Sequence, residues 1–157
     1  MHRRAVLKGG LSTVPLAMLA AAGLLPRLSA ASASSNWPSD AFNAEDLEQA
    51  ERLLFSDVAV EDSDLIVITA PDIAENGRVV PVEIAVGLPN AQRVALLSDG
   101  NPFPLLAQAH FTPEVEPVVS VRVKMGESAN LIALAEADGK LYRAMRAVKV
   151  TAGGCGG

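Results

Sequence analysis

The sequence predicts a mainly β protein: an immunoglobulin-like β-sandwich with one N-terminal amphipathic helix and a flexible C-terminal arm. Seven short apolar runs follow one another in the last two thirds of the chain, separated by turn-forming residues. Two of the runs, 80–86 and 119–125, place an apolar side chain at every second position. One stretch before them has helical rather than strand-like periodicity. Half-buried strands at this spacing are typical of a two-sheet sandwich.

The helix is predicted over residues 44–55. Asn43 is a suitable N-cap, and Phe42 and Leu47 are placed to form a hydrophobic staple across the first turn. Leu47 and Leu54 then lie on one face at helical spacing. We therefore expect this helix to lie against the domain with that face buried.

The strands are predicted from the apolar runs and the turns between them. Asn76-Gly77, Asp99-Gly100 and Asp138-Gly139 are dipeptides that tolerate the positive φ of tight turns, which indicates hairpins. The seven predicted strands are 65–70, 78–86, 92–97, 105–112, 118–125, 129–137 and 141–151.

The first 33 residues have the pattern of an export signal. Arg3 and Arg4 form a twin-arginine pair, followed by the apolar run 11–25 and small residues that suit cleavage after Ala33, with Leu28-Ser29-Ala30 as a second site. The apolar run is shorter than the roughly 20 residues that a transmembrane helix needs, so a permanent membrane anchor fits less well. We expect export of the folded chain to the periplasm by the twin-arginine route. The predicted organisation is a signal peptide over 1–33, the helix and sandwich over 34–150, and a flexible C-terminal arm over 151–157.

The charge of the exported part excludes some classes of partner. Cleavage after Ala33 leaves 9 basic and 18 acidic side chains, a net charge of −9. Such an excess of acid argues against nucleic acid and anionic membranes as partners. The basic side chains gather in the last strands, where they form either ordinary solvated faces or a docking surface near the C-terminus: Arg122, Lys124, Lys140, Arg143, Arg146 and Lys149.

The C-terminus carries the chemistry. Cys155, the only cysteine, lies beyond the last predicted strand with two glycines on each side: Gly153, Gly154, Gly156 and Gly157. Glycine has no side chain to bury and the greatest backbone freedom, so we expect a thin, mobile arm. Five extended residues let the sulfur reach roughly 17 Å beyond the fold. An unpaired cysteine in an exported protein indicates either an intermolecular disulfide or a free thiol with a function.

Catalysis by the chain itself and a metal site both lack the necessary residues. His110 is the one histidine left after signal removal, and we interpret it as an ordinary strand residue. One thiol and one histidine do not make a four-ligand zinc site. We expect no metal, no cofactor and no catalytic residues of the chain's own.

Three segments and the tail resemble a known family. The tail 153–157 after Val148-Lys149-Val150-Thr151, the segment 71–77 followed by Val80-Pro81-Val82, and Arg122-Val123-Lys124-Met125 followed by Glu127-Ser128 are similar to the SoxY family of the thiosulfate-oxidising Sox system. The resemblance covers nearly the whole exported chain, and the twin-arginine signal agrees with it. Val123 replaces the isoleucine expected there, without chemical consequence.

The resemblance implies a carrier rather than an enzyme. It implies that Cys155 covalently holds thiosulfate-derived sulfur species and presents them to sulfur-oxidising partner enzymes. It also implies a heterodimer with a SoxZ-like subunit. Two other classes stay open: a ubiquitin-like sulfur carrier that uses the terminal Gly-Gly carboxylate, and a structural module with an intermolecular disulfide through Cys155.

Overall fold

The computed structural model describes residues 37–152. The predicted signal peptide and the predicted site residues Gly153, Gly154, Cys155, Gly156 and Gly157 lie outside the described residues. The helices are α2 (Ser39–Phe42) and α3 (Leu47–Phe55). The strands are β1 (Val60–Asp62), β2 (Ile66–Thr69), β3 (Ile73–Ala74), β4 (Val80–Val86), β5 (Ala91–Ser98), β6 (Leu105–His110), β7 (Val118–Val123), β8 (Ala129–Ala137) and β9 (Lys140–Val150).

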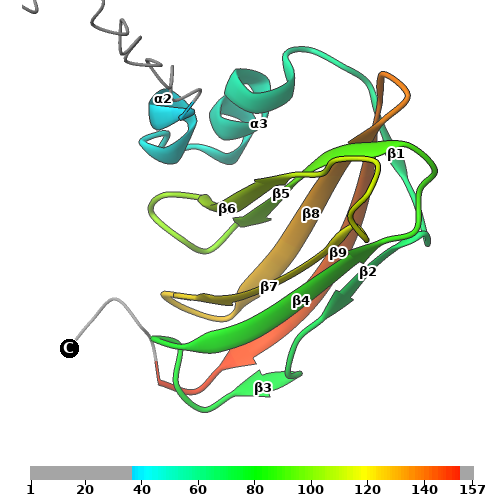
Figure 1. Ribbon diagram of the computed structural model, residues 1–157. Coiled ribbons are helices and arrows are strands. Elements are labelled where there is room, and N and C mark those ends of the chain that lie inside the picture. Colours follow the sequence, from blue (N-terminus) through cyan, green and yellow to red (C-terminus); the bar gives the residue numbers. More distant parts are fainter. Residues whose placement is uncertain (1–36, 153–157) are drawn as a thin grey trace, which may run out of the picture. The chain divides into compact units, whose positions relative to one another are not determined.

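The strands form two sheets, which confirms the predicted sandwich. The larger sheet has the order β1-β9-β8-β5-β6, with the short β3 also paired to β9. The smaller sheet has the order β2-β4-β7. Figure 1 shows the two sheets as separate layers, with the helices on the side of the larger sheet that faces away from the smaller one.

The core between the sheets follows from the alternation in the sequence. Val80, Val82, Ile84 and Val86 of β4 all point inward and are almost fully buried. They pack against inward-facing side chains of the larger sheet such as Leu131. Fully burying one such side chain stabilises the fold by roughly 1.5–3 kcal/mol. The period of two along each strand therefore builds this core.

A second core lies between the helices and the larger sheet. Ala50, Leu54 and Phe55 of α3 pack on buried residues of the sheet such as Leu97 and Leu134. This explains why β5 and β8 are apolar on both faces and do not alternate.

The helix prediction was right in kind but wrong at its N-terminus. The helix begins at Leu47, and the Asp46 side chain is its cap, accepting a hydrogen bond from the Gln49 N–H at 2.9 Å. Asn43 instead ends the preceding short helix α2. Phe42 lies within α2, where its ring stacks on Trp37 at 4.5 Å, so it is not the staple partner at the start of α3.

All seven predicted strands are present, β8 with its predicted bounds and the other six with shifted ends, and two further strands were missed. The strand predicted from residue 78 begins at Val80, because the Arg78 N–H donates to the Asn76 side chain in a turn. β1 and β3 pair with β9 in parallel, and neither shows an alternating pattern that could have predicted it. The Asp138-Gly139 hairpin is confirmed, with φ of 51° and 73° at its two residues.

Candidate functional site

The site of interest is the end of β9, where the chain passes towards Cys155. The Thr151 N–H donates to the Ala74 carbonyl at 3.0 Å, and the Thr151 hydroxyl donates to the Glu75 carbonyl at 3.2 Å. The Ala152 carbonyl accepts from the Gly77 N–H at 2.8 Å. Three hydrogen bonds therefore hold the last two described residues to the end of β3 and the turn that follows it.

A second contact holds β9 from the other side. The Ser128 hydroxyl accepts a hydrogen bond from the Val150 N–H at 2.9 Å and lies 3.3 Å from the Val150 carbonyl oxygen, to which it donates. The Met125 N–H donates to the Gly77 carbonyl at 2.7 Å. The backbone N–H and carbonyl of Gly77 thus link Met125, before β8, to Ala152, just after β9.

These contacts change the interpretation of Asn76-Gly77. The pair was predicted to lie in a hairpin between the strands 65–70 and 78–86, and these strands, β2 and β4, do pair antiparallel; the link is not a tight turn, however, because β3 intervenes and pairs with β9 of the other sheet. This turn carries the chain from one sheet to the other and binds Ala152 on the way. Segments 71–77 and 122–128, on which the family resemblance partly rests, therefore form the mount of the C-terminal tail.

The sequence did not indicate Thr151, Ser128 or Gly77 as contributors to this mount. Their hydrogen bonds run mainly to backbone atoms, and such pairings leave no characteristic residue pattern. The resemblance located the segments but said nothing of their mechanical role.

The other predicted residues behave as surface groups. His110 is exposed at the end of β6, and its ring Nε2 lies 3.3 Å from the Gln108 side-chain nitrogen. Residues 37–152 contain no cluster of three or more His, Cys, Asp or Glu side chains placed to hold a metal ion. Within the same residues, neither helix is long and apolar enough to cross a membrane.

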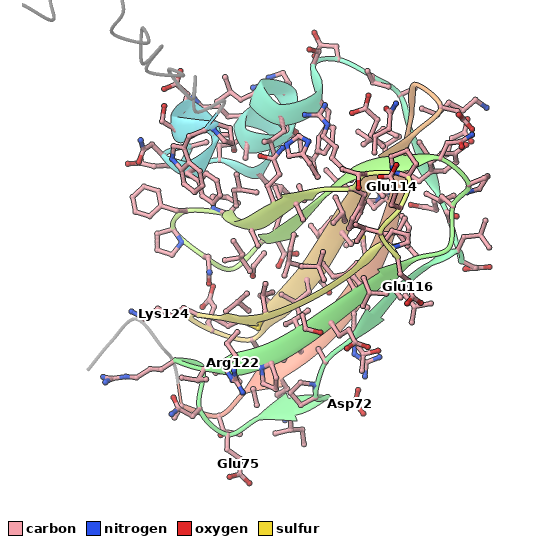
Figure 2. All side chains as sticks on the ribbon, in the orientation of Figure 1. Asp72, Glu75, Glu114, Glu116, Arg122 and Lys124 are labelled. Atoms are coloured by element: carbon pink, nitrogen blue, oxygen red, sulfur yellow. The ribbon has the colours of Figure 1, made fainter. Side chains whose placement is uncertain are left out.

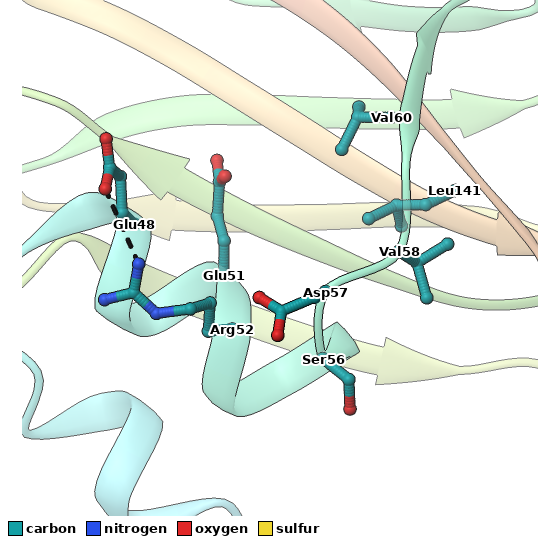
Figure 3. A pocket seen from close by; sticks show the side chains of 8 residues that line it. All are labelled: Glu48, Glu51, Arg52, Ser56, Asp57, Val58, Val60 and Leu141. Carbon is teal, nitrogen blue, oxygen red and sulfur yellow. Dashed lines mark ion pairs between the residues drawn. The ribbon is translucent and has the colours of Figure 1, made fainter.

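An open cleft of about 210 Å³ lies between α3 and the start of β9. Figure 3 shows the carboxylates of Glu48, Glu51 and Asp57 around it, with Arg52 paired to Glu48 at 3.5 Å. Leu141, which also lines it, is nine residues before Val150, about 30 Å along an extended strand. The acidic side chains that line this cleft repel anions such as thiosulfate. The cleft also lies at the opposite end of β9 from the mount, so we do not interpret it as a site for sulfur compounds.

Glu51 in this cleft gives a prediction for stability. Burial raises the pKa of Glu51, an effect that Arg143 opposes and Glu48 reinforces. The folded chain thus holds this proton more tightly than the unfolded chain, so charged Glu51 destabilises the fold above its raised pKa. We expect Glu51→Gln to raise the thermal midpoint at pH 7 by about 1–2 °C, with the gain shrinking as the pH falls towards the ordinary value of 4.5.

Thermal unfolding of the wild type and of the Glu51→Gln variant, measured from about pH 4 to about pH 8, checks this expectation, because this interval runs from the ordinary pKa of a glutamate to above neutrality. Glu114→Gln, an exposed site on the loop before β7, is the matched control and should leave the midpoint unchanged. A glutamine variant at position 51 that is less stable at neutral pH would show that the Arg143 attraction outweighs burial.

The fold and the mount define a class of protein: a single immunoglobulin-like sandwich whose last strand is anchored immediately before a tail that carries one cysteine. The model of the family "Sulfur oxidation protein SoxY" matches residues 51–155. The chain belongs to the SoxY family.

Solved structures agree with this assignment. The sulfur carrier protein SoxY from Chlorobium limicola f thiosulfatophilum is 40% identical, with a TM-score of 0.62 over 67% of this chain and 96% of that chain. A superoxide reductase (neelaredoxin) variant from Ignicoccus hospitalis, 22% identical, has a TM-score of 0.52 over 58% of this chain and 94% of that one, and shares the fold alone. No curated protein matches the sequence.

Proposed function

We propose that this protein is a periplasmic carrier that covalently holds sulfur intermediates of thiosulfate oxidation on Cys155 and presents them to partner enzymes of the Sox system. One observation carries the proposal: in a SoxY-family chain, hydrogen bonds anchor the backbone up to Ala152, immediately before Gly-Gly-Cys-Gly-Gly. The proposed carrier arm over 151–157 is attached to the 34–150 domain through its first two residues, Thr151 and Ala152, which the mount holds by hydrogen bonds, so the free reach is proposed for the residues after Ala152.

The chemistry at Cys155 needs an electron acceptor that the partner supplies. Joining thiosulfate to the thiol forms a sulfur–sulfur bond, releases the thiol proton and transfers two electrons to an oxidising partner enzyme. Water then cleaves the terminal sulfonate group from the resulting S-thiosulfonate, which releases sulfate and one proton and leaves a protonated persulfide (–S–SH) on Cys155. A second partner enzyme catalyses that step.

The carrier contributes the attachment sulfur and its position rather than catalysis. His110 is exposed at a strand end, and the carboxylates of the cleft lie at the start of β9, far from the mount. Neither provides a base for the thiol at the other end of that strand. We therefore propose a substrate-carrier subunit without catalytic residues of its own.

A SoxZ-like subunit is the proposed stable partner. On the outward face of the smaller sheet, Val67, Ala85 and Val118 are aligned across the three strands, and the two valines are 53% and 40% exposed. Leu65, 54% exposed, lies just before β2. An exposed apolar row of this kind favours a heterodimer over an isolated domain.

Transfer of cargo tests the carrier function, because neither a structural disulfide module nor an inert domain passes sulfur on. The mature protein is loaded with thiosulfate and the oxidising partner enzyme, freed of small molecules, and then given the hydrolysing partner. We expect about one sulfate released per chain, from the single thiol. Loaded protein that releases no sulfate would contradict the proposal.

Export gives a separate prediction. Replacing Arg3 and Arg4 by lysine should reduce the mature protein in the periplasm to a small fraction of the wild-type amount, because the twin-arginine pair is the proposed address. Immunoblots of fractionated cells measure this amount. A variant with the signal exchanged for one of the unfolded-export route is the control, and normal periplasmic levels of the lysine variant would refute the proposed route.

A further inference from the structure

The basic side chains of the domain fall into two groups that differ in their ion pairs. Residues 37–152 contain nine lysines and arginines. Five are in ion pairs with carboxylates: Arg52 with Glu48, Arg93 with Glu136, Lys140 with Glu61, Arg143 with Asp62, and Arg146 with Asp72. The other four are exposed and make no ion pair with any described residue: Arg78, Arg122, Lys124 and Lys149.

All four unpaired cations lie around the mount of the tail, and we call them the basic collar. Arg78 follows Gly77, whose N–H binds the Ala152 carbonyl. Lys124 precedes Met125, whose N–H binds the Gly77 carbonyl, and Arg122 lies two residues before Lys124 on the outward face of β7. Lys149 is two residues before Thr151 in β9.

The segments that carry the collar have a net positive charge, whereas the domain as a whole is negatively charged. Segments 72–78, 122–128 and 146–152 contain five cations and three anions, a net of +2, although Glu75 and Glu127 lie among them. The rest of residues 37–152 contains four cations and fifteen anions, a net of −11. Figure 2 shows Arg122 and Lys124 at the end of the sandwich where β9 finishes, and Glu114 and Glu116 at the opposite end.

This separation of charge orients the molecule in an electric field. A negatively charged surface repels the rest of the domain, with its net charge of −11, and attracts the collar, so an encounter with it brings the mount in first. Complementary charges of this kind act mainly on the rate and orientation of association. Four exposed side chains at one end suit an extended protein surface better than a small anion, which a buried, enclosed set of donors would hold.

We propose that the basic collar docks onto an acidic surface around the active-site opening of the partner enzyme that receives Cys155. The inference rests on the carrier function proposed above and adds the chemistry of the partner surface. The cargo is itself anionic, so direct attraction of small anions to the collar is the competing explanation, and the experiment separates the two.

The experiment compares two variants with the same change of charge in the full mature protein. The collar variant is Arg122→Glu with Lys124→Glu, and the control is Arg52→Glu with Lys140→Glu at the other end of the domain. Steady-state loading of Cys155 with thiosulfate by the oxidising partner enzyme is measured against carrier concentration and salt. Thermal unfolding of both variants shows that the fold is retained.

We expect kcat/KM of the collar variant to fall by about tenfold or more at low salt, with kcat unchanged. The difference should shrink towards 1 M salt, where the Debye length is about 3 Å. The control should load at the wild-type rate. A collar variant that loads like the wild type at low salt would overturn the docking proposal and leave the carrier function intact, whereas failure of the wild type to load would overturn both.

A second measurement excludes direct attraction of small anions. The Cys155 thiol is allowed to react with an anionic aryl disulfide and with a neutral pyridyl disulfide, without any enzyme. Docking predicts that the ratio of the two rates changes less than twofold in the collar variant, since exposed single charges have weak effects on small ions. A loss with the anionic reagent as large as the loss with the enzyme would overturn docking in favour of small-anion attraction.

Discussion

Cys155→Ser is expected to abolish loading of the mature protein with thiosulfate, to below detection by intact mass. Serine has nearly the same size as cysteine, but its oxygen does not form the sulfur–sulfur bond on which the carrier function depends. The mature chain has no second thiol to take its place. Loading is measured by mass after incubation with thiosulfate and the oxidising partner enzyme.

The fold should be unaffected by this substitution. The cores lie between the two sheets and under the helices, and the last described hydrogen bond of the mount is made by Ala152. The thermal midpoint should stay within about 1 °C of the wild type, as for a substitution away from buried groups. Loading of the serine variant at the wild-type level would place the attachment at another atom.

Replacing Gly153 and Gly154 together by proline is expected to reduce the rate of enzyme-catalysed loading by about a hundredfold. A loss of this size is typical when a reacting group is held about 1 Å from its correct position. Proline restricts φ to about −65° and adds ring bulk, whereas glycine permits far more backbone conformations and occupies the least space. If the arm must thread a narrow channel to reach the partner's active site, both changes hinder it. Loading rates with the partner enzyme measure the effect.

Two controls locate the defect in delivery. The thiol of the proline variant should react with a neutral small disulfide at the wild-type rate, because that reagent needs no channel. A matched variant with alanine at both positions, which adds only a methyl group at each, should load at an intermediate rate. Full-rate loading of the proline variant by the enzyme would refute the arm mechanism even if Cys155 is essential.

Local pattern was sufficient to predict most of the sandwich but not the pairing of its short strands. The alternation of Val80, Val82, Ile84 and Val86 reports directly which face is buried. β1 is exposed along its whole length and β3 has two residues, so their pairing with β9 depends on the tertiary arrangement. The start of α3 was misplaced for a similar reason, because Asn43 and Asp46 are both good caps and only the packing of α2 distinguishes them.

Of the candidate site, the sequence predicted the reactive residue but not the hydrogen bonds that hold the backbone before it. Composition singled out Cys155 as the reactive group, and that role stays a prediction. The mount could not be predicted, because Thr151 and Gly77 act through contacts to segments far away in the sequence. The unequal distribution of basic residues was visible in the sequence, but only the ion pairs show which four cations remain at the mount without a partner among residues 37–152.

The mass of the C-terminal peptide, taken from mature protein purified from the native host during growth on thiosulfate, tests the central claim most directly. The carrier function predicts a thiosulfonate or persulfide on Cys155, removed by a reducing agent. A thiocarboxylate at Gly157 would instead indicate a ubiquitin-like sulfur carrier, and a disulfide-linked dimer through Cys155 without any sulfur adduct would indicate a structural module. Either of these two results would contradict the account.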